Sequence, residues 1–152
     1  MTLAKPPRLE RVFQKYDPPL YFVTLCTADR KKIPASKKVY AALTNYGQLG
    51  IERGFALGRF VVMPDHIHFF VTGGDDFDLG LWIRGLKRVV AAAVTGGRGG
   101  FWQRGFFDHI VRNSESYSQK WDYVRENPVR AGFVRTAGEW PFQGEVVLIE
   151  HR

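Results

Sequence analysis

The sequence predicts an α+β fold, because short stretches typical of strands alternate with stretches typical of amphipathic helices. In order, the 152 residues predict strand, helix, strand, strand, helix and strand, followed by one further helix. This βαββαβ order is that of ferredoxin-like folds, which have an antiparallel sheet with two helices on one face. We therefore expect one ferredoxin-like domain over residues 1–152 with an appended C-terminal helix.

The first half of the chain predicts three strands and one helix. Residues 5–19 are rich in proline and charge, so we expect a flexible N-terminal arm over about 1–19. Residues 21–27 are β-branched and aromatic and predict the first strand. Ser36 can cap a helix whose apolar residues recur at the helical spacing. Residues 55–63 predict a strand that Pro64-Asp65 turns directly into the next one, so the two should pair antiparallel.

The second half predicts two helices around a glycine-rich loop. The first has one apolar stripe, formed by Leu79, Trp82, Ile83, Leu86, Val89, Val90 and Ala93. Residues 96–100 form a flexible connector, and residues 106–112 predict a strand. A last helix begins near Ser114 and ends near Asn127, because Pro128 disfavours helical geometry before it. The final apolar run, residues 146–149, is either an edge strand or a tail packed on the core.

His66 and His68 are the first candidate site residues. Side chains alternate along a strand, so both histidines leave one face while Ile67, Phe69 and Val71 leave the other. The apolar residues serve the helix-covered core, so the histidines should point to the uncovered face. Two such imidazoles can bind one divalent ion if an oxygen ligand arrives from elsewhere. Two histidines that merely pack or hydrogen-bond are the alternative.

The charge balance favours a polyanionic partner. Lys and Arg number 22 and Asp and Glu 15, which gives a net charge of +7 and a pI near 9.8. Nucleic acid is the first candidate, an anionic membrane surface the second, and a basic protein without such a partner the alternative. Candidate DNA contacts are the basic residues off the apolar stripe, the arginine of the glycine loop and an aromatic residue beside it, namely Arg84, Lys87, Arg88, Arg98 and Trp102.

Cysteine usage and the N-terminus bear on the compartment. Cys26 is the single cysteine, which excludes an internal disulfide and a cysteine zinc cluster. The first residues contain no apolar signal-peptide core, and no apolar run is long enough to span a bilayer. We therefore expect a soluble, cytoplasmic protein that has no membrane partner.

Three motifs together resemble one protein family. They are Met63-Pro64-Asp65-His66-Ile67-His68, the run from Trp102 to His109, and the run from Tyr123 to Gly132. In this order, within about residues 21–134, they resemble single-tyrosine transposases of the His-hydrophobic-His superfamily, most closely the REP-associated tyrosine transposases. Asp65 stands where that family commonly has asparagine, and the tail departs from the family pattern.

The resemblance implies an activity and a set of site residues. It implies cleavage of single-stranded DNA through a 5′-phosphotyrosine, with Tyr123 on the last helix as nucleophile and His66 and His68 as metal ligands. Insertion-sequence relatives take the third ligand from a glutamine on the tyrosine's helix, and Asn127 can supply the amide oxygen here. It also implies Mg²⁺ or Mn²⁺ as cofactor and single-stranded or hairpin DNA as partner. We further expect Arg125 and Arg130 to contact DNA, and either a homodimer or a monomer.

Elementary chemistry agrees with this role for Tyr123. A tyrosine titrates near pH 10, so at neutral pH it attacks a phosphodiester only when its proton is removed or the phosphate is polarised. Tyr117, Trp121 and Val124 form the packing stripe of the last helix, whereas Tyr123 and Asn127 are four residues apart on another face. Two alternatives remain: a domesticated protein that binds hairpin DNA without cutting it, and a metallophosphoesterase that uses water.

Overall fold

The computed structural model describes residues 19–32 and 36–149, so most of the predicted N-terminal arm lies outside the described residues. The described strands are β1 (Leu20–Cys26), β2 (Phe55–Met63), β3 (His66–Gly73), β4 (Phe107–Val111) and β5 (Gln143–Glu145). The helices are α2 (Ser36–Gly47), α3 (Gly50–Arg53), α4 (Leu79–Thr95), α5 (Ser114–Val124) and α6 (Asn127–Arg130), with short 3-10 turns η1 (Ala28–Arg30) and η2 (Ala137–Glu139).

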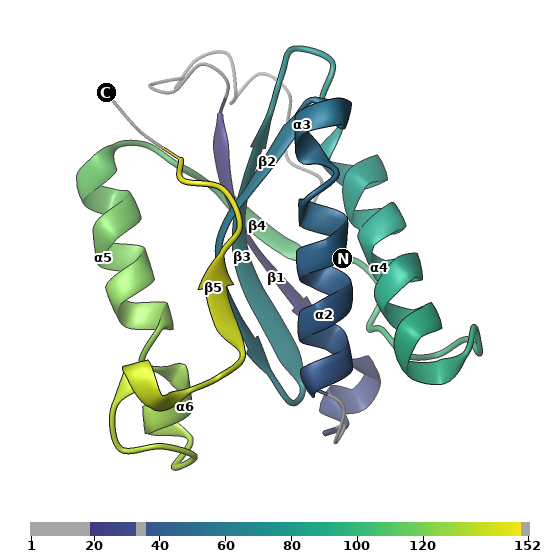
Figure 1. The fold of residues 1–152 in the computed structure, drawn as a ribbon, viewed down its shortest axis with the longest axis vertical. Helices are drawn as coiled ribbons and strands as arrows, with labels where there is room; N and C mark the ends of the chain where they lie inside the picture. Colours follow the sequence, from purple (N-terminus) through teal and green to yellow (C-terminus); the bar gives the residue numbers. More distant parts are fainter. Residues whose placement is uncertain (1–18, 33–35, 150–152) are drawn as a thin grey trace.

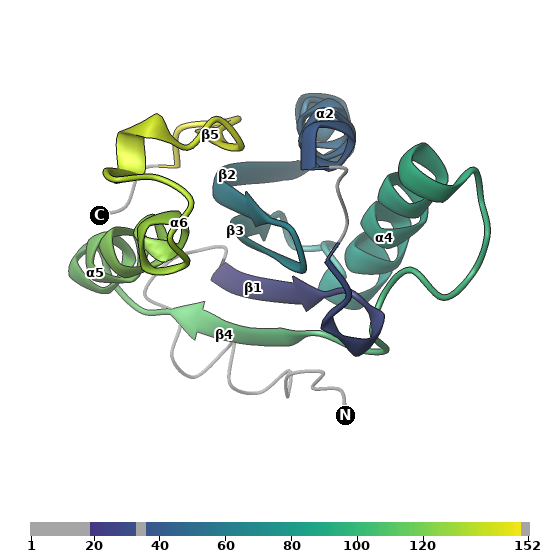
Figure 2. The same ribbon diagram turned by 90° about the horizontal axis from the view of Figure 1, so that it is seen from below.

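The strands form one antiparallel sheet in the order β4-β1-β3-β2-β5. α2 and α4 lie on one face of this sheet, and α5 and α6 lie on the other side (Figures 1 and 2). The predicted α+β class, the βαββαβ element order and the two helices on one face are confirmed. The tail forms the edge strand β5 beside β2, immediately before the apolar run.

Local sequence accounts for where several elements begin and end. Asp78 precedes α4 and accepts a hydrogen bond from the backbone N–H of Leu81, and Gly96 ends the helix at φ 73°, a left-handed conformation that favours glycine. Asn113 caps α5 by accepting from the N–H of Ser116. Pro64 and Asp65 form the tight turn between β2 and β3, which places His66 at the first position of β3.

Two apolar clusters lie on opposite faces of the sheet. The larger joins α2 and α4 to the face that carries Ile67, Phe69 and Val71, as predicted. The smaller joins α5 to the other face, where Tyr117 and Val124 pack with Phe22 and Phe70. The face of the histidines is therefore partly covered by α5 and is not open as the sequence led us to expect. The reason is the aromatic surface that this face presents to the helix.

The last predicted helix is interrupted. α5 ends at Val124, and Asn127 opens the separate short helix α6, in which Pro128 occupies the first turn. Proline is tolerated there because the first backbone N–H groups of a helix have no intrahelical partner. Tyr123 and Asn127 consequently lie on two different helices, and the prediction of one helix carrying both is wrong.

Candidate active site

His66 and His68 project from β3 toward the face that α5 partly covers. Register pairs His66 with Cys26 and His68 with Thr24 on β1. The two imidazole rings are 4.7 Å apart between centroids and nearly perpendicular, at 76°. The predicted pair is therefore brought together at one end of the sheet, next to the β2–β3 turn.

Both imidazoles are held through the same ring atom. Nδ1 of His68 shares a hydrogen bond of 2.8 Å with the hydroxyl of Thr24. Nδ1 of His66 donates to Oδ1 of Asp65 at 2.7 Å, because an ionised carboxylate can only accept. Among the described residues, Nε2 of neither ring has a hydrogen-bond partner. A carboxylate on one ring nitrogen is the arrangement that orients a metal-binding histidine through its other nitrogen.

Arg30 completes the support of His66. Its guanidinium lies 3.2 Å from Oδ2 of Asp65 and 3.4 Å from Nδ1 of His66. Asp29 and Arg30 have φ of 56° and 53°, a left-handed conformation that costs a non-glycine residue about 1–3 kcal/mol. This strained turn directs Arg30 onto the carboxylate. Sequence reasoning did not predict this contact, because Arg30 and Asp65 are 35 positions apart and such a contact has no local signal.

The surroundings keep both histidines neutral. Burial lowers the pKa of His68 to about 3, helped by the positive charges of Lys120, Arg30 and Arg130 and by His66. Burial also lowers the pKa of His66, although its hydrogen bond to Asp65 acts in the opposite direction. A neutral imidazole is the form that binds metal, so neither histidine has to release a proton before it binds a metal ion near neutral pH.

The donor set supplies two ligands of the three predicted. Both imidazoles are neutral and are anchored at Nδ1, so their Nε2 atoms suit a divalent ion that accepts mixed nitrogen and oxygen ligands. Among the described residues, no group of three or more His, Cys, Asp or Glu side chains could hold such an ion. Asn127, the predicted third ligand, instead accepts a hydrogen bond from the guanidinium of Arg130 through its amide oxygen.

Tyr123 lies in the last turn of α5 with 64% of its surface exposed. The guanidinium of Arg130 stacks on its ring, 4.0 Å from the centroid, and donates to its backbone carbonyl at 2.8 Å. Tyr117, in contrast, is 5% exposed and packs edge-on against Phe70. The predicted distinction between a packed Tyr117 and an accessible Tyr123 is confirmed.

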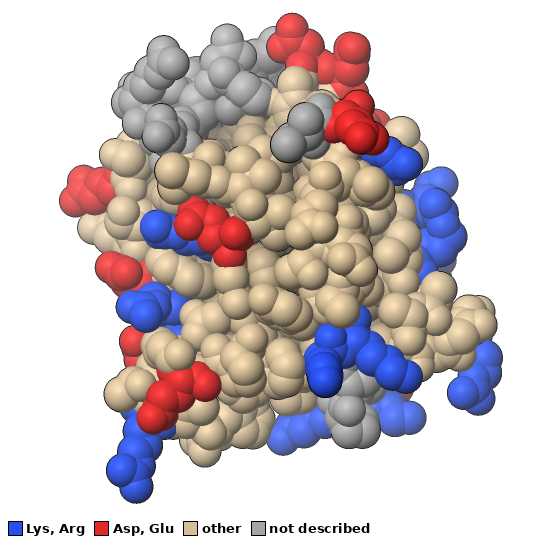
Figure 3. All heavy atoms as spheres, in the orientation of Figure 1, with Lys and Arg blue, Asp and Glu red and all other residues tan. Residues whose placement is uncertain are grey.

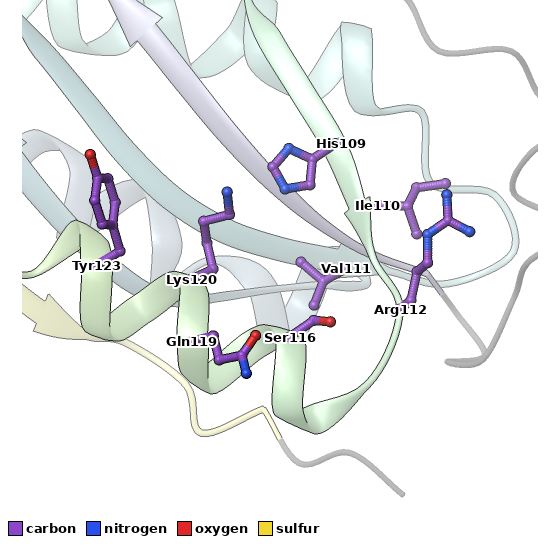
Figure 4. Close-up of a pocket in the computed structure, with 8 residues that line it drawn as sticks. All are labelled: His109, Ile110, Val111, Arg112, Ser116, Gln119, Lys120 and Tyr123. Atoms are coloured by element: carbon purple, nitrogen blue, oxygen red, sulfur yellow. The ribbon is translucent and has the colours of Figure 1, made fainter.

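A hollow of about 390 Å³ lies beside Tyr123, between β4 and α5. Figure 4 shows its lining, which consists of His109, Ile110, Val111, Arg112, Ser116, Gln119, Lys120 and Tyr123. Sequence reasoning did not single out Lys120, and it named His109 only as the last residue of the second motif. The available signal was the spacing of Lys120 and Tyr123, since residues three apart share a helix face.

The basic residues predicted on the second helix do not flank the histidines. α4 packs on the opposite face of the sheet, so Arg84, Lys87 and Arg88 lie away from them. Lys and Arg line the side of the molecule over α4 in Figure 3, whereas acidic residues lie mostly over α5 and the upper end. The cations that act on His68 are instead Arg30, Lys120 and Arg130.

Two of the predicted DNA contacts have structural partners. The Lys87 ammonium donates to the backbone carbonyls of Gln103 and Gly105 at 3.0 and 2.7 Å, and burial lowers its pKa. The indole N–H of Trp102 donates to the carbonyl of Lys87 at 2.9 Å, and its ring packs against the core. Trp102, a predicted DNA contact, is therefore held by the fold.

Arg98 and Arg125, two further predicted contacts, lie apart from Lys87 and Trp102. Arg98 lines a second hollow of about 340 Å³ near the glycine loop. Arg125 follows α5 and is half-buried.

Comparison with known proteins adds relatives and similar folds. No known family profile matches the chain. A REP-associated tyrosine transposase of Escherichia coli K12 is 36% identical over 94 residues, which are 60% of this chain and 54% of that protein. A putative REP-associated tyrosine transposase of Haemophilus influenzae is 26% identical over 136 residues, 81% of this chain and 77% of the relative. The match thus spans about half the length of the Escherichia coli protein.

Two solved structures have similar folds. A structure described as the REP-associated tyrosine transposase bound to a REP hairpin superposes with a TM-score of 0.72 at 24% identity, covering 94% of this chain and 82% of the other. A putative transposase from Deinococcus radiodurans R1 gives a TM-score of 0.52 at 16% identity, covering 70% and 88%. At these identities the likeness shows the fold. Within the described residues of this chain, no helix is long and apolar enough to cross a membrane.

Proposed function

Because the chain is a relative of the REP-associated tyrosine transposases, we propose that it cleaves and rejoins single-stranded DNA next to hairpin-forming repeats. The observation that carries this proposal is the histidine pair, in which each ring is anchored at Nδ1 and leaves Nε2 without a partner among the described residues. A protein that only bound DNA would have no need of this arrangement. Support also comes from the exposed tyrosine on α5.

The proposed reaction is a displacement at phosphorus. The Tyr123 oxygen forms a bond to the scissile phosphorus and loses its proton, while the bond from phosphorus to the upstream 3′-oxygen breaks and that oxygen takes up a proton as a 3′-hydroxyl. Cleavage leaves the downstream strand attached to Tyr123 by its 5′-phosphate. Attack of a 3′-hydroxyl on this linkage reverses the chemistry and joins strands.

The cofactor of this proposal is a divalent cation, Mg²⁺ or Mn²⁺. Nε2 of His66 and of His68 would hold it, with the amide oxygen of Asn127 as third ligand once that oxygen leaves Arg130. When bound, the ion supplies positive charge that polarises the phosphate. Asp65 and Thr24 fix the orientation of the two rings throughout.

A second candidate function is binding of hairpin DNA without cleavage. The hydrogen bond between Arg130 and Asn127 favours it, because it occupies the predicted third ligand. The two functions differ in one product, the covalent complex between protein and DNA.

The test is a covalent-capture assay with hairpin oligonucleotides that carry randomised single-stranded flanks. We expect an oligonucleotide labelled at its 3′ end to give a denaturation-resistant adduct in Mn²⁺, and a 5′ label to follow a released fragment ending in a 3′-hydroxyl. Cleavage that leaves both fragments free would identify a metallophosphoesterase. Binding with no cleavage in either metal would identify the non-cleaving binder.

A further inference from the structure

The hollow between β4 and α5 has the size and position of a binding site. Its volume of about 390 Å³ falls within the range of small-ligand pockets, roughly 300–1,000 Å³. One wall is the helix that carries Tyr123, and the other is the edge strand of the sheet that carries the histidines. A group that enters the hollow therefore lies beside the tyrosine.

Lys120 supplies a positive charge on the side of this hollow that lies between Tyr123 and His109 (Figure 4). Its ammonium lies 5.2 Å above the centroid of Phe22, and this ring lies between His68 at 5.4 Å and His109 at 5.3 Å. Burial lowers the pKa of His109, and the positive charge of Lys120 lowers it further. Lys120 forms no ion pair with any of the described residues, so its charge is available to an anion. Figure 4 shows the ammonium between Tyr123 and His109.

Phe107 adds an exposed aromatic ring on β4, outside the lining of the hollow. It lies two residues before His109 on β4, so both side chains leave the same face of the sheet. Its partner across the strands is Thr24, the residue that holds His68. The ring is 56% exposed, which is uncommon for a phenylalanine on a sheet face beside an apolar cluster. An exposed ring of this kind can stack on an unpaired base.

We propose that this hollow, together with the exposed ring of Phe107 two residues before His109 on β4, forms a subsite for one nucleotide of unpaired DNA, in which Lys120 binds a backbone phosphate and Phe107 stacks on the adjoining base. A phosphate matches the uncompensated ammonium, and a base of a duplex could not offer its face to Phe107. The subsite deepens the proposed function, because the strand that it holds is the one presented to Tyr123. The basic residues of α4 belong to another face and take no part in it.

The experiment measures binding of the full-length chain in EDTA, where no cleavage occurs, to a hairpin oligonucleotide with a single-stranded flank. Flank phosphates are replaced one at a time by uncharged methylphosphonates, and flank bases one at a time by abasic sites. The variants are Lys120→Gln and Phe107→Ala, with Lys120→Arg and Phe107→Trp as rescues. Lys37→Gln is the matched control, because Lys37 is an exposed lysine on α2 over the other face.

We expect Lys120→Gln to weaken binding about three- to tenfold and to reduce the slope of log affinity against log salt by about 0.7, the loss of one single-strand phosphate contact. A methylphosphonate at one flank position should weaken DNA binding by the parent protein and should not change DNA binding by Lys120→Gln. Phe107→Ala should weaken binding about tenfold. The affinity of this variant should no longer change when the base next to that phosphate is replaced by an abasic site. Lys120→Arg and Phe107→Trp should restore binding.

The subsite is overturned if Lys120→Gln behaves as Lys37→Gln does, or if no single phosphate or base accounts for the losses. These outcomes are separate from failure of the proposed function. A chain that shows the phosphate and base coupling but never forms a tyrosyl adduct retains the subsite and loses the cleavage activity. A chain that forms the adduct but shows neither the phosphate coupling nor the base coupling retains the cleavage activity and loses the subsite.

Discussion

Arg130 joins the predicted nucleophile to the predicted third ligand. Its guanidinium stacks on the ring of Tyr123, 4.0 Å from the centroid. The same side chain donates to the backbone carbonyl of Tyr123 and to the amide oxygen of Asn127. One cation thus holds α5 and α6 together and occupies the amide oxygen that we propose as the third metal ligand.

The first prediction follows from this contact. Arg130→Ala should raise the affinity for Mn²⁺ severalfold, because it frees the Asn127 oxygen and removes a positive charge that acts on His68. Isothermal titration calorimetry without DNA measures this affinity. Adding Asn127→Ala to the same protein should cancel the part of the gain that depends on the amide. A fall in Mn²⁺ affinity in Arg130→Ala would show that Asn127 is not a ligand.

The second prediction concerns the support of His66. Asp65→Ala removes the carboxylate that fixes the ring at 2.7 Å, and outer-shell partners of this kind contribute about 10–100-fold in metal affinity. Asp65→Asn keeps an oxygen acceptor and loses only the charge, so it should retain most of the affinity. Titration with Mn²⁺ compares the two. Equal losses in both variants would mean that the charge, and not the orientation of His66, is what matters.

The third prediction is a pH dependence of stability in the metal-free protein. The pKa of His68 falls from 6.5 to about 3 on folding, so the unfolded chain binds the proton more readily between these values. Stability should therefore decrease as pH falls below 6.5, by up to about 3 kcal/mol at pH 4 from this residue. Urea denaturation of the parent and of His68→Gln at pH 7 and pH 4 isolates the effect. An identical pH dependence in both proteins would contradict it.

The fourth prediction separates a lysine of α4 that holds a loop from an exposed arginine of the same helix. Lys87→Met leaves the carbonyls of Gln103 and Gly105 without their donor and should lower the free energy of unfolding by about 1–2 kcal/mol. Arg84→Gln, at an exposed position, should change it by less than about 0.5 kcal/mol. Thermal unfolding gives both values. Equal stability of the two variants would show that the Lys87 contacts contribute nothing.

Local patterns were sufficient to predict most elements of this fold. The turn at Pro64-Asp65 and most of the apolar stripe of α4 are set by residues that favour turns and by spacing, so they could be read directly; Val89 and Ala93, predicted in that stripe, are exposed. The likeness to REP-associated tyrosine transposases, predicted from three motifs, is confirmed by the relatives. The break after Val124 could not be read, because a proline ends one helix or begins another with equal ease.

Contacts between distant residues explain the rest of what was missed. Arg30 reaches Asp65 only because a strained turn at the end of β1 lies beside the β2–β3 turn. Lys87 is withdrawn from the surface by a loop that follows it by more than fifteen residues, as its bond to Gly105 shows. Phe22 and Phe70 lie in strands where either face can be buried, so docking of α5 on them had no local signature.

The proposed mechanism requires Tyr123 as the nucleophile, and the most direct test is covalent capture of 3′-labelled hairpin DNA by matched tyrosine variants. Tyr123→Phe removes one exposed oxygen and should abolish the adduct while leaving folding and DNA affinity nearly unchanged. Tyr117→Phe alters a tyrosine of the packed face of α5 and should still form the adduct. An adduct formed by Tyr123→Phe at the parental level would contradict the proposed mechanism.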